Sequence, residues 1–224
     1  MGFTAGLFKY GKQHSLGNYK HKGRISIMEN NKLKVKDLVN IGIFSALYMA
    51  IAMVVMIPVG IAPILWLLWP GIAGLFGGVF FTLLLTKVPK MGASLLLALI
   101  SGILFFATGE CTWVIIVTFA IAGLLAEVMR KVLGYKSFKG IALAGGFCAI
   151  GFIGSPLPMW LFQESYMKSI EEMGMGAEYV EGLQSMISAG SFIGMLAVAF
   201  IGGLLGTLIG HKMLKKHFEK AGIV

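Results

Sequence analysis

Six long apolar stretches, separated by polar or proline-marked breaks, constrain this chain more than any other feature of its sequence. A hydrocarbon core about 30 Å thick is crossed by roughly 20 apolar residues of helix, and helices satisfy their own backbone groups there. The composition agrees, because the chain is 57% hydrophobic and 13% charged, whereas soluble domains carry about 25% charged residues. We therefore predict an all-α integral membrane protein. Its six transmembrane helices are predicted at residues 38–57, 64–86, 91–107, 112–133, 138–162 and 186–210.

Lysine and arginine are distributed unevenly around these predicted helices. Of the 19 Lys and Arg residues, Lys168 alone falls in a loop that follows an odd-numbered helix. Those loops carry acids instead, namely Glu110, Glu164, Glu171, Glu172, Glu178 and Glu181. Because cytoplasmic loops are enriched in Lys and Arg, we predict a multi-pass protein of the cell membrane with both termini cytoplasmic and the 163–185 loop external. This topology accounts for the net charge of +9, so we expect no nucleic-acid partner.

The first 27 residues differ from the rest of the chain. They are basic and lack both the continuous apolar core and the small-residue cleavage site of a signal peptide. Met28 begins a sequence that would suit the start of a membrane protein. Two interpretations stay open, a native start at Met28 or a disordered basic tail. Either way, we expect a basic extension at 1–27 and one six-helix membrane domain at 28–224.

The predicted helices carry little chemistry at the membrane midplane. Ionisable residues inside transmembrane helices mark functional pathways, yet Asp37 and Glu127 fall near predicted cytoplasmic ends and none falls at mid-depth. All four histidines fall on the predicted cytoplasmic side, and the sequence has neither an HExxH motif nor a phosphate-binding GxxxxGK[ST] string. Cys111 and Cys148 are far apart and form no CxxC motif. We therefore expect no enzyme activity, no metal site and no cofactor bound directly by this chain.

Small residues recur at four-residue spacing in several predicted helices. This spacing places them on one helix face, where another backbone can approach closely. For most of these helices we expect the face to pack inside the bundle. Such stripes comprise Gly74 and Gly78, Ala122 and Ala126, and Gly202, Gly206 and Gly210. The first predicted helix is a better candidate for a partner interface, because Gly42, Ala46 and Ala50 form a three-step stripe.

Aromatic and polar residues gather at the predicted external ends of the helices. The candidate binding residues among them are Trp66, Trp69, Glu110, Trp113, Trp160, Gln163 and Tyr166. Two interpretations stay open. The residues could form an interfacial aromatic belt, which needs no ligand, or a pocket for a small molecule, built from apolar rings with a few polar groups. The 163–185 loop is long enough to be a lid or a solvated linker.

Several short strings resemble the substrate-binding S components of energy-coupling factor (ECF) transporters, and among these the Trep_Strep or MptD-like family. The strings are Lys87–Lys90 followed by Gly92 and Ala93, the turn from Phe105 and Phe106 to Gly109 with Trp113, Ala126–Glu127, Tyr135–Lys139, and KKHFEKAGIV at 215–224. The resemblance covers the chain from about Lys34 to its end and carries over no ligand assignment.

This resemblance implies a six-helix bundle of the S-component type that captures a small solute or micronutrient outside the cell. Its implied partners are a transmembrane T component and two ATPase subunits, which hydrolyse the ATP. It also implies that Ala46 and Ala50 in the first helix meet the T component. The alternative function is a stand-alone secondary transporter or a small-solute channel, for which we would expect midplane polar residues and broken helices in both halves.

Overall fold

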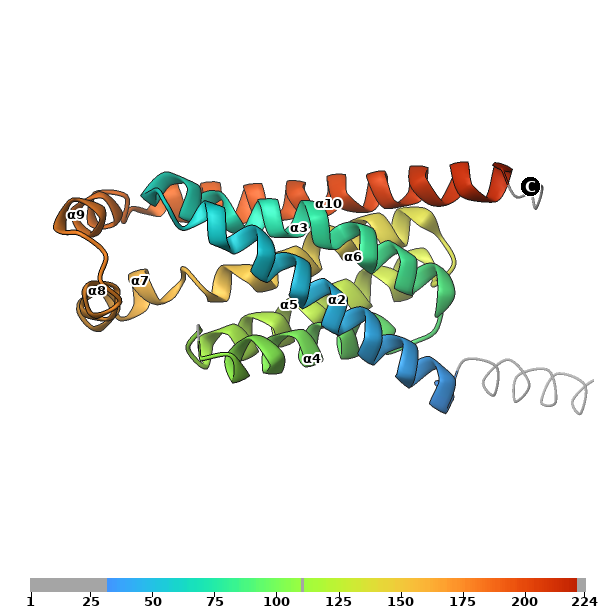
Figure 1. Cartoon of the computed structure of the whole chain (residues 1–224). Coiled ribbons are helices and arrows are strands. Elements are labelled where there is room, and N and C mark those ends of the chain that lie inside the picture. The colour runs from blue at the N-terminus through green and yellow to red at the C-terminus, as the bar shows by residue number, and fades with distance from the viewer. Residues whose placement is uncertain (1–31, 110, 221–224) are drawn as a thin grey trace, which may run out of the picture.

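The computed structural model describes residues 32–109 and 111–220, the last four by their backbone alone, and the described part contains helices and no strand (Figure 1). The long segments are apolar, and in apolar surroundings a backbone satisfies its N–H and C=O groups by hydrogen-bonding within a helix. The elements are α2 (Val35–Val59), α3 (Pro63–Lys87), α4 (Ala93–Ala107), α5 (Val114–Leu133), α6 (Phe138–Ala149), the 3-10 helix η1 (Ile150–Gly154), α7 (Pro158–Leu161), α8 (Gln163–Glu172), α9 (Ala177–Ser185) and α10 (Ala189–Lys220).

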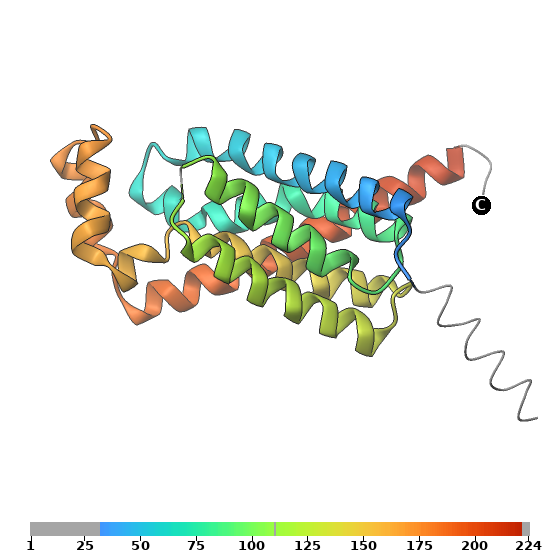
Figure 2. The same cartoon turned by 90° about the horizontal axis from the view of Figure 1, so that it is seen from below.

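The long helices lie side by side in one bundle, and consecutive passes run in opposite directions (Figures 1 and 2). The start of α2 and the end of α10 therefore lie at the same end, together with the α3–α4 and α5–α6 connections. We call this the lysine-rich end. The short helices α8 and α9 form a hairpin across the opposite end, which we call the hairpin end (Figure 2).

Among the described residues, three helices are long and apolar enough to cross a membrane by length and composition. They are Val35–Val59, Pro63–Lys87 and the Ala189–Lys216 part of α10. Two shorter apolar segments, Ala93–Ala107 and Phe138–Gly154, accompany them. Six spans and cytoplasmic termini stay predictions from the sequence.

The structure differs from the predicted boundaries in three places. The predicted loop at 163–185 holds the helices α8 and α9. The predicted fifth helix, 138–162, is interrupted, because α6 ends at Ala149 and passes through η1 before α7. The last helix begins at Ala189 and continues to Lys220, ten residues beyond its predicted end at 210.

Glycine determines the closest helix contact, between α3 and α10. A methyl group added to Gly202 would overlap the carbonyl oxygen of Gly71, and one added to Gly78 would lie 2.7 Å from the carbonyl carbon of Gly206. Such backbone contact is possible only where both helices lack side chains. The expectation that the glycine stripes of these two helices pack inside the bundle is therefore confirmed.

Aromatic rings fill the middle of the bundle. The Trp69 ring meets Phe152 edge-on, with 5.4 Å between ring centroids, and meets Phe105 in the same way at 6.2 Å. Phe119 and Tyr48 also contact Phe152, at 5.2 and 5.1 Å. All five rings are almost completely buried. Edge-to-face pairs of this kind add to the energy of apolar burial.

Two carboxylates hold the α3–α4 connection at the lysine-rich end. Lys90 Nζ lies 2.6 Å from Asp37 Oδ2, in the first turn of α2. Gly92 has a φ of +88°, a left-handed conformation that glycine adopts without strain. Its N–H donates to Glu127 Oε1 of α5 at 2.7 Å, and the Ser94 hydroxyl donates to Glu127 Oε2. Glu127 thus joins the start of α4 to α5.

Arg130 lies beside this carboxylate, and its side chain is fully buried. Its Nη1 lies 3.8 Å from Glu127 Oε2 and donates to the Lys90 carbonyl oxygen at 3.3 Å. Its guanidinium group also lies 5.0 Å from the centroid of the Tyr135 ring. The sequence strings 87–93, 126–127 and 135–139, on which the family resemblance rests, therefore meet at this end of the bundle.

Candidate functional site

A cavity of about 350 Å³ lies at the hairpin end, where α2, α3, the α4–α5 connection and the α8–α9 hairpin meet. Its volume is at the lower end of the range for small-molecule sites, about 300 to 1,000 Å³. The lining consists of Met56, Ile57, Gly60, Trp66, Gly109, Cys111, Thr112, Ser155, Tyr166, Ser169, Ile170, Met173, Met175 and Tyr179.

The hairpin is held over the bundle by a second apolar core. Met167 of α8 and Val180 and Leu183 of α9 are buried there, against residues of α3, η1, α7 and α10 that include Leu67. A methyl group added to Gly182 would lie 2.9 Å from Cγ of Pro63, so α9 packs directly on the start of α3. Burial of such side chains stabilises the covered arrangement by roughly 1.5 to 3 kcal/mol each.

One hydrogen bond joins the bundle to the hairpin across the cavity wall. Trp66 Nε1 of α3 donates to the Tyr166 hydroxyl of α8 at 3.0 Å. Burial raises the pKa of Tyr166 well above its ordinary value, although the Trp66 hydrogen bond lowers it slightly. Burial also raises the pKa of Tyr179. Both phenols therefore stay protonated at neutral pH and can donate a hydrogen bond to a solute.

The lining is neutral and mainly apolar. Among the described residues that line the cavity there is no Asp, Glu, Lys, Arg or His. Its polar groups are hydroxyls of Ser, Thr and Tyr and the thiol of Cys111. Methionine side chains are flexible and polarizable, so Met56, Met173 and Met175 can adapt to an irregular apolar shape. The described part of the lining is suited to the apolar surface of a small solute and to a few of its hydrogen-bonding groups.

No metal chemistry is indicated by the described part of the chain. It contains no group of three or more His, Cys, Asp or Glu residues that could hold a metal ion. Cys111 and Cys148 are both buried. Cys148 lies in the aromatic interior, where the Tyr48 hydroxyl is 4.0 Å from its sulfur.

The structure places two of the candidate binding residues, Trp66 and Tyr166, in the cavity lining. Trp69 does not reach the cavity, because it is fully buried beneath Trp66, with 5.7 Å between the stacked ring centroids. The Trp69 ring packs against the other rings of the aromatic interior, and this packing keeps it away from the cavity. Glu110 lies outside the described residues, and its chain neighbours Gly109 and Cys111 line the cavity.

The other three candidates lie away from the cavity. Trp113 is 57% exposed, with its ring 6.4 Å from that of Phe162. Trp160 donates its Nε1 hydrogen to the Ser188 carbonyl oxygen at 3.2 Å, which joins α7 to the segment before α10. Gln163 is exposed at the first position of α8. The exposed position of Trp113 is typical of an interfacial aromatic residue.

Most of the lining was not among the candidates. The residues missed in this segment are Ser169 and Ile170 of α8 and Met173 directly after it, which follow Tyr166 at spacings of three, four and seven. This is the spacing of one helix face. Treating 163–172 as an amphipathic helix would have found them, but the acids of this segment led to its interpretation as a loop.

The predicted partner stripe lies on an open face of α2. Ala46 and Ala50 are exposed, and a methyl group added to Gly42 would meet nothing within 4 Å. This differs from the glycine stripes of α3 and α10, in which Gly74, Gly78, Gly202, Gly206 and Gly210 each face the backbone of the other helix. The partner interface itself stays a prediction.

A family model described as a hypothetical bacterial integral membrane protein (Trep_Strep) matches residues 35–220. The match begins with α2 and ends with α10, so it covers every described helix. No curated protein and no solved structure matches the chain.

Proposed function

The chain belongs to the Trep_Strep family of bacterial integral membrane proteins, and from this premise we propose that it is the substrate-binding S component of an ECF-type importer. A small solute binds in the cavity at the hairpin end, which faces the outside of the cell. A transmembrane T component and two ATPase subunits complete the importer, and the ATPases hydrolyse the ATP. This chain binds no cofactor and carries out no reaction.

The observation that carries the proposal is the cavity itself. It lies at one end of the bundle, and its described lining is neutral and consists mainly of rings and methionines. The α8–α9 hairpin covers it, and the hydrogen bond from Trp66 of α3 to Tyr166 of α8 joins the hairpin to the bundle. A site of this form captures a solute from one side of the membrane. The two short α8 and α9 helices form the element that would open and close over it.

The open stripe on α2 suits the T component. Small residues at Gly42, Ala46 and Ala50 allow another helix to approach the α2 backbone closely. The glycine stripes Gly74–Gly78 of α3 and Gly202–Gly206–Gly210 of α10 are already occupied by each other's helix. The stripe is therefore a small-residue face that remains available for an intermolecular contact.

One observation favours a second candidate, a stand-alone carrier. The α6–η1–α7 segment is a broken helix, and carriers place such breaks at their substrate sites. The first half of the bundle has no corresponding break, since α2, α3 and α4 are continuous. The importer subunit is therefore the better supported function.

Co-purification tests the proposed function. The tagged full-length protein is extracted in mild detergent from its host, and mass spectrometry identifies the partner chains and retained small molecules. A T component together with two ATPases is the expected result. Recovery of the protein alone, combined with solute transport in liposomes without ATP, would instead identify a solitary carrier.

Replacing Ala46 with tryptophan is expected to prevent recovery of the T component while solute binding is retained. A bulky ring on this face holds the partner helix away, and overpacking costs typically about 1 to 3 kcal/mol. The matched control is Leu124→Trp, at an exposed position of α5 outside the stripe. Equal recovery of the T component with both variants would show that the stripe is not the interface.

Replacing Trp66 with alanine is expected to weaken binding of the co-purified solute about 30-fold or more, because central aromatic residues contribute about 2 kcal/mol or more to binding. Tyr166→Phe keeps the ring and removes the hydroxyl, so we expect a weakening of about fivefold. Equilibrium binding measures both changes. Phe162→Ala is the control, since this ring is 45% exposed and lies outside the lining. If all three variants bind equally well, the solute binds elsewhere.

A further inference from the structure

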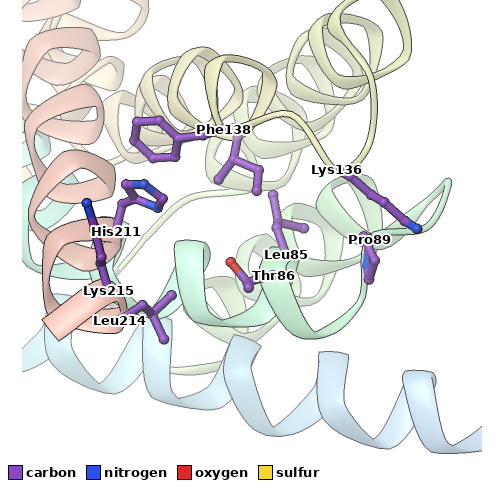
Figure 3. A pocket seen from close by; sticks show the side chains of 9 residues that line it. Leu85, Thr86, Pro89, Lys136, Phe138, His211, Leu214 and Lys215 are labelled. Carbon is purple, nitrogen blue, oxygen red and sulfur yellow. The ribbon is translucent and has the colours of Figure 1, made fainter. Parts of the chain in front are cut away.

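A second cavity, of about 490 Å³, lies at the lysine-rich end between α3, α6 and α10 (Figure 3). It is separate from the solute cavity, which lies at the opposite end of the bundle. Its lining consists of Leu85, Thr86, Pro89, Lys136, Phe138, Ile141, His211, Leu214 and Lys215.

The floor and the rim of this cavity differ in chemistry. Leu85 and Ile141 are buried and form an apolar floor with Leu214. On one side the His211 and Phe138 rings stack, with 3.8 Å between their centroids, and Lys215 lies beside them (Figure 3). Lys136 lies on the other side, near Pro89 (Figure 3). Cationic groups therefore border an apolar hollow on two sides.

The surroundings of the cavity are strongly cationic. Lysines of the helix ends, of the connections and of α10 gather at this end, namely Lys87, Lys90, Lys131, Lys136, Lys139, Lys212, Lys215 and Lys216. Among the acids of this end whose side chains the structure describes, Asp37 and Glu127 are bound to Lys90, to backbone N–H groups and to Ser94. The negative charges of these two carboxylates are therefore already paired inside the bundle. The first turn of α6 adds the positive end of a helix dipole at Phe138, with no side-chain cap.

We propose that this cavity binds an anionic phospholipid, a role beyond solute capture. The lipid phosphate lies between Lys136 and the Lys215–His211 side, and an acyl chain covers the floor of Leu85, Ile141 and Leu214. A free anion would gain from the lysines but would leave the apolar floor in water, whereas a lipid satisfies both parts of the site. Basic pockets between membrane helices attract anionic headgroups in this way.

Thermal unfolding of the purified full-length protein in uncharged detergent micelles tests the proposal. Dioleoyl phosphatidylglycerol is titrated in, and dioleoyl phosphatidylcholine and sodium phosphate at equal ionic strength are titrated separately. Phosphatidylglycerol is expected to raise the melting temperature in a saturable manner, and the other two additions are expected not to. An equal rise with sodium phosphate would identify a free-anion site and overturn the lipid proposal.

Two sets of variants locate the effect. The double variant Lys136→Gln with Lys215→Gln is expected to raise the half-saturating phosphatidylglycerol concentration about 20- to 30-fold, since each lysine adds to the attraction of an anionic headgroup. The control pair, Lys139→Gln with Lys212→Gln, removes the same charge from the same end of the bundle at positions outside the lining. Equal losses in both pairs would show general surface attraction and overturn the site.

Thr86→Trp provides a test that leaves every charge in place. Thr86 is exposed on the cavity wall, so a large ring there fills the space of the acyl chain without disturbing the core. We expect weaker phosphatidylglycerol binding with an unchanged melting temperature in phosphatidylcholine. Unchanged phosphatidylglycerol binding in this variant would overturn the proposed place of the acyl chain.

Discussion

Replacing Glu127 with glutamine is expected to lower the free energy of unfolding by about 3 to 5 kcal/mol, the effect of leaving a buried charge without its partner. Glutamine has nearly the same shape, so packing is preserved. The substitution removes the negative charge of the Glu127 carboxylate, whose Oε2 lies 3.8 Å from Nη1 of the fully buried Arg130. The Nε and Nη2 atoms of Arg130 already lack a hydrogen-bond partner in the described structure, and Glu127 is the only described carboxylate paired with its charge. Reversible unfolding in mixed micelles measures the change.

A second substitution separates charge from packing. Adding Arg130→Met to Glu127→Gln removes the unpaired charge, and a neutral pair of similar volume is expected to recover most of the lost stability. The control is Glu172→Gln, which breaks the exposed Lys168–Glu172 pair at 3.9 Å and should leave stability unchanged. If Glu127→Gln is as harmless as the control, the buried pair does not hold this end of the bundle.

Apolar length alone was sufficient to predict several helices closely. The predicted segment 64–86 is observed as Pro63–Lys87, and 91–107 is observed as Ala93–Ala107. These helices end where proline, glycine or lysine follows an apolar run, and such ends can be recognised locally. The start of α3 is an example, because Pro63 occupies its first position.

The break in the fifth segment depends on contacts that a local pattern cannot reveal. Pro156 and Pro158 disfavour continuation of a helix, but the change to 3-10 geometry begins earlier, at Ile150. In η1, a methyl group added to Gly151 would overlap the Phe119 ring, and one added to Gly154 would lie 2.6 Å from Cα of Ile115. The segment therefore follows the surface of α5, and that surface is set by the packing of the whole bundle.

The candidate site was predicted in part for the same reason. Aromatic residues near predicted helix ends indicated the end of the molecule where this cavity lies, and Trp66 and Tyr166 line it. Their sequence positions could not distinguish Trp69, one turn further along α3 and fully buried, from Trp66. Acidic side chains outside the lining concealed the apolar face of α8. The hairpin that covers the cavity packs on Pro63, which is a long-range contact that a local sequence pattern does not reveal.

Replacing Gly202 with alanine is expected to lower the free energy of unfolding by about 1 to 3 kcal/mol. The new methyl group would overlap the Gly71 carbonyl oxygen and lie 2.7 Å from Gly71 Cα, so the two helix backbones must separate. Neither can yield by changing a rotamer, because the contact is backbone on both sides. Since α3 and α10 form the most extensive helix pair, the separation also disturbs the neighbouring contact of Gly78 with Gly206.

Gly194→Ala is the matched control, because Gly194 lies on the same helix and a methyl group there meets nothing within 4 Å. Alanine favours a helix interior over glycine by roughly 0.5 to 1 kcal/mol, so this variant should be unchanged or slightly more stable. The two substitutions are chemically identical and differ only in what faces them. Opposite effects on the melting temperature would therefore show that close contact of α3 with α10 stabilises the bundle. Equal effects would mean that helix propensity alone determines the change and that α10 does not depend on glycine for its position.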